Sequence, residues 1–179
     1  MPQVRLVRLI GAALEAAGAP RPASLGLILS DDRELARLNR QAMGRAGPTD
    51  VLSFPLLAPS AFPPHAGQEP TTDDQAGSGS GPAFVLPPGR RIHLGDLVIS
   101  VERAVEQAAQ GRGGQTGDHG GIPGGIGDGG TRDAWSAADE LCLLAVHGAL
   151  HICGWDHARP AERDAMRAEE RQLLARARR

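Results

Sequence analysis

The sequence predicts an α+β fold: a single domain, residues 1–179, in which a small mixed β-sheet of about four strands packs with four to six helices. At 179 residues, 41% hydrophobic and 22% charged, the chain has room for one hydrophobic core. Apolar residues recur at helical spacing in some stretches and form short runs in others. Strands and helices alternate in the first half of the chain, which favours partly parallel pairing.

The first elements have recognisable ends. Residues 3–17 carry apolar residues at helical spacing, and Gly18 is a plausible C-cap. Residues 24–30 (S-L-G-L-I-L-S) are predicted to form a short buried strand. Asp31 then opens a helix, with Glu34 three residues later in a relative of the capping box.

The later elements follow the same logic. Strands are expected at 51–55 and 92–99, and Ser100 caps the helix after the second of them. Ser136 begins the most apolar helix, which is hydrophobic nearly all round and is therefore expected to be the central buried one. Pro160 suits the first turn of a final helix.

Two stretches interrupt this order. Residues 58–90 are rich in Pro, Gly, Ser and Thr, and residues 111–131 are dominated by Gly. Such compositions bury too little apolar surface to offset the entropy of ordering, so we expect two flexible insertions. His65 and His119 lie inside them and are poor candidates for metal ligands, because a flexible segment holds a ligand poorly.

Composition excludes several classes of protein. No apolar run approaches the roughly 18 residues that span a bilayer, and the N-terminus lacks the layout of a secretion signal, so we expect a cytoplasmic protein. The net charge of −2 argues neither for nor against a polyanionic partner, and all 19 basic residues are Arg, which we interpret as genome bias. Cys142 and Cys153 are too few for a disulfide framework and are interpreted as small core residues.

Three histidines indicate a metal site. His147 and His151 are four residues apart on the apolar helix, so their rings project from one face and can chelate one ion. Gly154 can take the left-handed conformation that ends the helix, and His157 then approaches the same ion from the loop. Three imidazoles with a fourth position left for water are typical of catalytic zinc. We therefore expect one metal ion at this site, with Zn²⁺ favoured, although imidazole also suits other transition metals.

The spacing of these histidines is that of the metzincin proteases, H-E-x-x-H-x-x-G-x-x-H. Gly148 stands where those proteases have the glutamate that deprotonates the zinc-bound water. The pattern therefore favours metal-assisted chemistry on a substrate other than a peptide bond.

Three segments of the chain resemble one known family. His147–His157 (H-G-A-L-H-I-C-G-W-D-H) looks like the signature of the YbeY-type endoribonucleases, also called rRNA maturation factors. Pro48–Pro55 (P-T-D-V-L-S-F-P), preceded by Leu38 and Asn39, and Leu94–Ser100 (L-G-D-L-V-I-S) are similar to two further family segments. They occur in the family's order.

The resemblance implies a metal-dependent endoribonuclease specific for single-stranded RNA. Such proteins are bacterial and cytoplasmic, and act in maturation of the small-subunit ribosomal RNA 3′ end and in ribosome quality control. The implied partners are ribosomal RNA and the small ribosomal subunit, with no DNA and no membrane. The implied zinc ligands are His147, His151 and His157.

One departure concerns phosphate binding. Family members commonly carry an arginine between the Asn and the Pro-Thr-Asp turn, and counting back from Pro48 that position is Met43. Arg45 or Arg40 is close in sequence but is expected to point elsewhere. Met43 therefore keeps open a ribosome-associated binding factor with a structural metal, beside a metalloprotease-like hydrolase favoured only by the ligand spacing.

Candidate catalytic carboxylates are Asp156 and Asp50. Asp156 precedes the third ligand and can orient an imidazole or carry a proton, or it is a solvated turn residue. Asp50 can bind its own turn or face the cleft, and Asp96 is similarly either a strand residue or part of the cleft. Trp155 either packs or stacks a nucleobase.

The charged residues of the final helix are interpreted as a solvated face: Arg167, Glu169, Glu170, Arg171, Arg176, Arg178 and Arg179. The nucleophile stays open between water and the neighbouring ribose 2′-hydroxyl, which differ in whether a cyclic phosphate is left.

Overall fold

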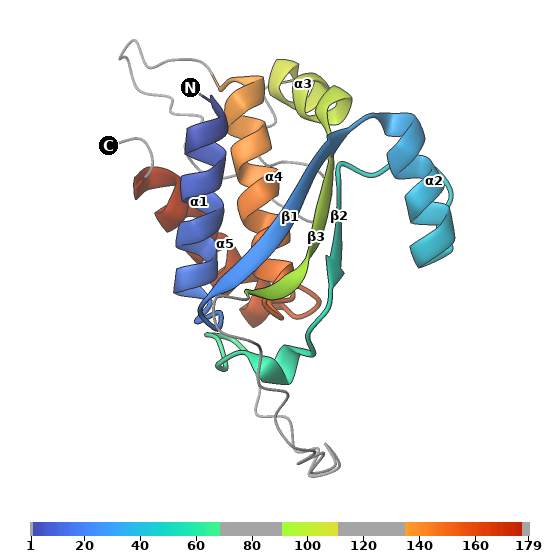
Figure 1. The fold of residues 1–179 in the computed structure, drawn as a ribbon. Helices are drawn as coiled ribbons and strands as arrows, with labels where there is room; N and C mark the ends of the chain where they lie inside the picture. The colour runs from blue at the N-terminus through green and yellow to red at the C-terminus, as the bar shows by residue number, and fades with distance from the viewer. Residues whose placement is uncertain (1, 69–90, 111–134, 177–179) are drawn as a thin grey trace, which may run out of the picture.

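The structure is a computed structural model, and it describes residues 2–68, 91–110 and 135–176. Within these residues the elements are α1 (Pro2–Ala16), β1 (Ala23–Ser30), α2 (Asp32–Met43), β2 (Val51–Pro55), the short 3₁₀ helix η1 (Pro59–Ala61), β3 (Ile92–Ser100), α3 (Val101–Ala109), α4 (Ala137–Ile152) and α5 (Pro160–Arg176). The predicted α+β class is confirmed (Figure 1). The sheet has three strands in the described residues, one fewer than expected.

Local sequence signals explain where the helices begin and end. The side chains of Asp31, Ser100 and Ser136 each accept a hydrogen bond from a backbone N–H in the first turn of α2, α3 and α4. Gly18, just after α1, has a φ of 65°, a left-handed conformation in which glycine carries no steric penalty. All four positions agree with the sequence-based prediction.

The sheet has the order β1-β3-β2, with β3 in the centre. β1 pairs with β3 in parallel, as the strand–helix alternation predicted, and β2 pairs with β3 antiparallel. β1 was expected to be a buried strand, and this was wrong. It is an edge strand among the described residues, and Ile28 and Leu29 are about half exposed.

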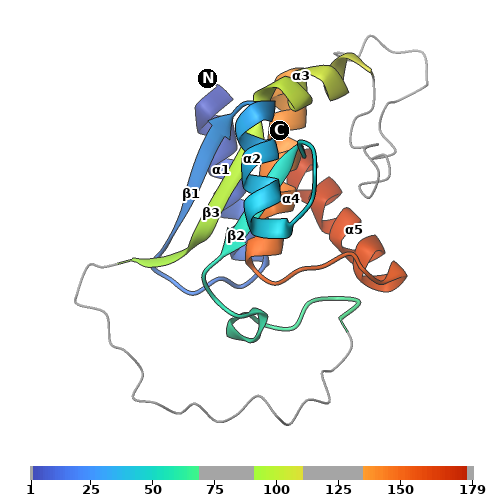
Figure 2. The same cartoon turned by 90° about the vertical axis from the view of Figure 1, so that its right-hand side faces the viewer.

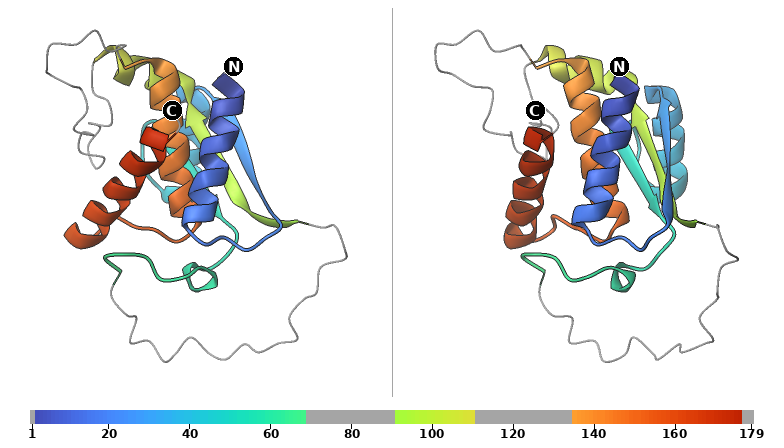
Figure 3. Two further views of the ribbon diagram at one scale, coloured as in Figure 1. Left: turned by 90° about the vertical axis from the view of Figure 1, so that its left-hand side faces the viewer. Right: turned by 60° about the vertical axis from the view of Figure 1, so that its left-hand side comes forward.

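Helices cover the two faces of the sheet unequally. α1, α4 and α5 lie on one face (Figures 1 and 3) and enclose the main core. α4 is buried nearly all round, as predicted. α2 lies on the opposite face (Figure 2), where Leu35 packs in a small separate cluster with Leu52 and Val98.

Part of the first expected insertion is described. Residues 58–68 contain η1, and the Phe62 side chain after it is buried in the main core. Residues 69–90 and 111–131, with His119, lie outside the described residues. In the described part of the chain, every helix is too short or too polar to cross a bilayer.

Candidate metal centre

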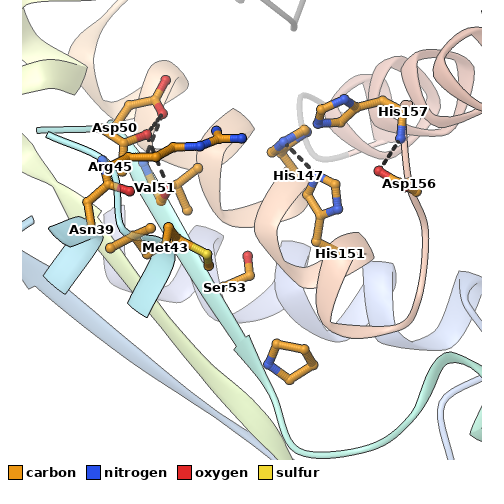
Figure 4. Close-up of a pocket in the computed structure, with 13 residues that line it drawn as sticks. Asn39, Met43, Arg45, Asp50, Val51, Ser53, His147, His151, Asp156 and His157 are labelled. Carbon is orange, nitrogen blue, oxygen red and sulfur yellow. Dashed lines mark hydrogen bonds between the residues drawn. The ribbon is translucent and has the colours of Figure 1, made fainter. Parts of the chain in front are cut away.

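The three predicted histidines converge at the C-terminal end of α4. His147 and His151 lie one turn apart on α4, and their Nε2 atoms are 3.1 Å from each other. Gly154, with a φ of 84°, turns the chain after the helix so that His157 approaches from the following loop (Figure 4). One ligand nitrogen from each ring lies within 4.8 Å of the others.

The outer nitrogens of the two helical histidines are held by acceptors. His147 Nδ1 lies 2.7 Å from Glu170 Oε1. His151 Nδ1 donates to the backbone oxygen of Trp155 at 2.8 Å, since a carbonyl oxygen can only accept. A proton on Nδ1 leaves the Nε2 lone pair free to bind a cation.

The electrostatics favour the neutral form of His151. Burial, followed by the neighbouring His147 and His157, lowers the pKa of His151 from 6.5 to about 3. A metal must otherwise displace a proton from its ligand. His151 therefore presents an unprotonated nitrogen at neutral pH.

These residues fit a zinc ion. Tetrahedral zinc with Zn–N bonds of about 2.0–2.1 Å places two ligand nitrogens roughly 3.3 Å apart. His147 and His151 are already near this spacing at 3.1 Å, and a ring nitrogen of His157 lies within 4.8 Å of both. The donors are imidazole nitrogens, and the rings of His147 and His151 have ordered outer hydrogen bonds, the usual pattern for zinc.

Gly148 sets how closely α4 approaches the sheet. A Cβ atom at this position would lie 2.6 Å from Leu97 Cδ2 and 3.2 Å from both Ser53 Oγ and Val51 Cγ2. Ser53 Oγ also donates to the carbonyl oxygen of Gly148 at 3.3 Å. The glutamate of the metzincin pattern would have to displace these side chains, which argues against the metalloprotease alternative.

A pocket of about 610 Å³ opens in front of the histidines. One wall is formed by the three histidines and Asp156, and the other by α2, the loop after it and β2, including Asn39, Met43, Arg45, Thr49, Asp50, Val51 and Ser53. Figure 4 shows the Arg45 guanidinium reaching from the second wall towards the histidines. The expectation that Arg45 would point elsewhere was therefore wrong, whereas Arg40 is not among the lining residues.

Asn39 fixes the loop that carries Arg45. The side-chain Nδ2 of Asn39 donates to the carbonyl oxygen of Gly47 at 3.0 Å. The backbone carbonyl oxygen of Asn39 accepts from Arg45 N at 3.4 Å. Gly44, which starts the loop, has a φ of 65° and donates its N–H to the same carbonyl. These contacts explain why an exposed arginine nevertheless faces the pocket.

The contacts of Asp50 fit the turn alternative. Its carboxylate accepts from Val51 N at 2.9 Å, from Thr49 Oγ1 at 3.2 Å and from Gln107 Nε2 at 3.1 Å. It therefore joins the start of β2 to α3. Asp96 lies on β3 beside His93, at 3.2 Å, and does not line this pocket.

Asp156 is exposed on the histidine wall. Its Oδ1 accepts from the backbone N of His157 at 2.7 Å, so it orders the loop that carries the third ligand. Its other carboxylate oxygen can face a molecule in the pocket, which Asp156 lines.

Glu170 is the site residue that sequence reasoning missed. It was expected on a solvated face, but its side chain is 3% exposed and contacts His147. The spacing of apolar residues on α5 could have identified it. Glu170 is four residues after Met166 and four before Leu174, both of which are buried. Helical spacing therefore puts Glu170 on the inner face of α5. Arg167 and Glu169 of the same expected solvated face are half-buried.

Trp155 and the cysteines behave as core residues. Trp155 is 8% exposed and one face of its indole is covered by His65, which agrees with packing rather than with an open stacking platform. Cys142 and Cys153 are free and buried, as predicted.

Known proteins are similar to this chain along most of its length. The family model described as endoribonuclease YbeY matches residues 3–118 and 129–178. The chain belongs to the endoribonuclease YbeY family. The matched range includes the histidine segment, the Pro48–Pro55 segment and β3, and residues of the first two line the pocket.

Individual relatives agree with this assignment. The chain is 36% identical over 154 residues to an endoribonuclease YbeY of Roseiflexus sp. (strain RS-1), covering 86% of this chain and 69% of that protein. It is 36% identical over 163 residues to that of Salinispora tropica (91% and 80%). It is 35% identical over 170 residues to that of Moorella thermoacetica (95% and 83%).

Proposed function

We propose that this chain is a zinc-dependent endoribonuclease specific for single-stranded RNA. Its substrate is the 3′ end of the small-subunit ribosomal RNA, and its role is maturation and quality control of the small ribosomal subunit in the cytoplasm. Membership of the endoribonuclease YbeY family supports the reaction class. The single observation that carries the metal dependence is the convergence of His147, His151 and His157 within 4.8 Å.

The two walls of the pocket have complementary roles. His147, His151 and His157 would hold the zinc, which would supply Lewis-acid polarisation of a phosphoryl oxygen and stabilisation of developing negative charge. Arg45 offers a planar fork of N–H donors from the opposite wall, suited to two phosphate oxygens. Its side chain forms no ion pair with the described residues that would compete with RNA.

The carboxylates have different roles. Asp156 is exposed beside His157 and lines the pocket, which supports a role for its carboxylate in accepting a proton from the nucleophile. Asp50 acts indirectly, by fixing the turn before β2 through its three hydrogen bonds.

Two nucleophiles are compatible with this site. Water attacking the phosphorus leaves a linear phosphate, whereas the adjacent ribose 2′-hydroxyl expels the 5′-oxygen and leaves a 2′,3′-cyclic phosphate. End-group analysis of the cleaved RNA distinguishes them. Neither route needs a glutamate at position 148.

The rival hypotheses are weakened by specific contacts. The metalloprotease alternative requires a side chain where Leu97 and Ser53 already approach Gly148. The binding factor with a structural metal rested on Met43, and Arg45 lies in the same pocket wall as Met43.

The deciding experiment combines metal analysis with RNA cleavage. Purified protein should contain one zinc per chain and cleave single-stranded RNA, and a chelator should abolish cleavage, which added zinc restores. His151→Ala should lose both properties while remaining folded. Undiminished cleavage by His151→Ala would refute the mechanism, and RNA binding without cleavage by the wild type would favour the binding factor.

A further inference from the structure

We propose that Glu170 is a positioning residue of the metal centre: its carboxylate fixes the ring orientation and tautomer of His147, so that Nε2 faces the ion. The inference rests on the proposed metal site and extends it to α5, an element that contributes no ligand.

The geometry ties two helices together at the site. Glu170 Oε1 and His147 Nδ1 are 2.7 Å apart across 23 residues of sequence. The two side chains are 3% and 5% exposed, so water does not compete for this contact. Burial also means that the effective dielectric is low and the interaction is stronger than at the surface.

The chemistry of the pair sets its direction. An ionised carboxylate can only accept hydrogen bonds, so Glu170 in its ionised form holds the proton on Nδ1 of His147. Nε2 then carries the lone pair, and this nitrogen is the one that faces His151 at 3.1 Å. Rotation of the ring by half a turn would break the contact with Glu170, which locks the productive orientation.

A core role alone does not account for a carboxylate at this position. Its helical neighbours Met166 and Leu174 are buried apolar residues, and a buried ion pair is usually no more stable than apolar residues of the same volume. The negative charge of Glu170 becomes favourable when a cation binds His147. The carboxylate then stabilises the positive charge that the imidazole transmits, and it raises the basicity of this ligand.

The two helical ligands therefore differ in strength. The acceptor of His151 is the neutral carbonyl of Trp155, whereas that of His147 is a carboxylate. Charge-assisted hydrogen bonds are roughly twice as strong as neutral ones. The ring of His147 is accordingly the more firmly oriented of the pair.

The test compares Glu170→Gln and Glu170→Leu with the matched control Glu169→Gln on the adjacent, half-buried position of α5. Zinc affinity is measured by competition with a chromophoric chelator, and the Tm of each metal-free protein is measured separately. Glu170→Leu should bind zinc about 10- to 100-fold more weakly. Glu170→Gln, whose amide oxygen still accepts from Nδ1, should lose less, and Glu169→Gln should match the wild type.

Histidine tautomers provide a readout that a purely structural role would leave unchanged. Long-range ¹H–¹⁵N correlation spectra should show His147 protonated at Nδ1 in the wild type and in Glu170→Gln, and a mixture of tautomers in metal-free Glu170→Leu. Wild-type zinc affinity in Glu170→Leu, or losses of affinity that only follow losses of Tm, would overturn the inference. A wild type that binds no zinc would instead overturn the proposed function and this inference with it.

Discussion

The imidazole of His65 lies flat against the indole of Trp155, with ring centroids 4.3 Å apart and ring planes 12° apart. Trp155 also supplies the carbonyl oxygen that holds His151. The segment after β2 therefore braces the loop between the second and third candidate ligands. This contact joins residues that were expected to be unrelated, since His65 was predicted to lie in a flexible insertion.

His65→Ala should lower the free energy of unfolding by about 0.5–1.5 kcal/mol, the usual contribution of a stacked aromatic pair. Denaturant unfolding measures this change, and a red shift of tryptophan fluorescence should accompany it as Trp155 becomes exposed. The matched control is His93→Ala on the exposed surface of β3, where the ring makes long contacts of 3.3 and 3.2 Å with Ser24 and Asp96. Equal effects of the two substitutions would contradict the brace.

Removal of the metal should leave the protein folded. α4 is held by apolar packing along its whole length, so its two histidines do not depend on the ion for their position. Chelator-treated protein should keep its far-ultraviolet circular dichroism and lose thermal stability only by the amount that ligand binding contributes. Cooperative unfolding on chelation would indicate a structural metal instead.

Arg45→Ala should reduce kcat/KM for RNA roughly 10- to 150-fold, because a charge-assisted hydrogen bond contributes about 1.5–3 kcal/mol. Arg45→Lys should retain part of the activity. Arg40→Ala, which removes an arginine outside the pocket lining, is the matched control and should have little effect. Zinc content should stay unchanged in all three, and a large effect of Arg40→Ala would show that only overall charge matters.

The double substitution Met43→Arg with Arg45→Ala tests the same wall of the pocket in the opposite direction. Met43 lines the pocket and is half exposed, so an arginine there has room and should restore activity lost in Arg45→Ala. Rates of RNA cleavage at saturating zinc measure the rescue. No recovery would mean that the position of the guanidinium, and not its presence, decides phosphate binding.

Gly148 and Gly11 both lie within helices, but they differ in the space available for an added side chain. Alanine at Gly11, where nothing lies within 4 Å of the added Cβ, should stabilise the protein by about 0.5–1 kcal/mol through helix propensity. Alanine at Gly148 meets the buried Leu97 at 2.6 Å and should be destabilising, since overpacking costs about 1–3 kcal/mol. Denaturant midpoints give both signs.

Gly148→Glu should destabilise more strongly than Gly148→Ala and should create no peptidase activity, although it completes the protease pattern. Casein hydrolysis by a folded Gly148→Glu variant would contradict the packing argument.

Both cysteines should be unreactive in the folded protein. Burial raises the pKa of Cys142, and it raises the pKa of Cys153 to about 12, so almost no thiolate exists between pH 7 and 8. A thiol reagent should modify neither residue until denaturant is added, and then both. Rapid labelling of Cys153 in the native state would show that the loop before His157 opens.

Short-range signals predicted the parts of the fold that depend on them. Caps at Asp31, Ser100 and Ser136 act within one turn, and the spacing of His147, His151 and Gly154 is a property of one helix and its end. The sequence could therefore predict which helices form and which histidines meet.

What the sequence could not predict depends on contacts between distant segments. Glu170 looked solvated because its Arg and Glu neighbours dominate α5, and only the packing of α5 on α4 shows that it meets His147. Arg45 looked misplaced because its direction is set by hydrogen bonds from Asn39 across a glycine-containing loop. The exposure of β1 depends on strand order, which no local pattern records.

The two walls of the pocket differ in how extensively they pack against the rest of the protein. The histidine wall is continuous with the main core, whereas α2 rests on a cluster of three buried residues, Leu35, Leu52 and Val98. Thermal motion should therefore widen or narrow the pocket by displacing α2 while the ligand geometry stays constant. RNA segments of different width are then accommodated by displacement of α2, and each still meets the same histidine nitrogens.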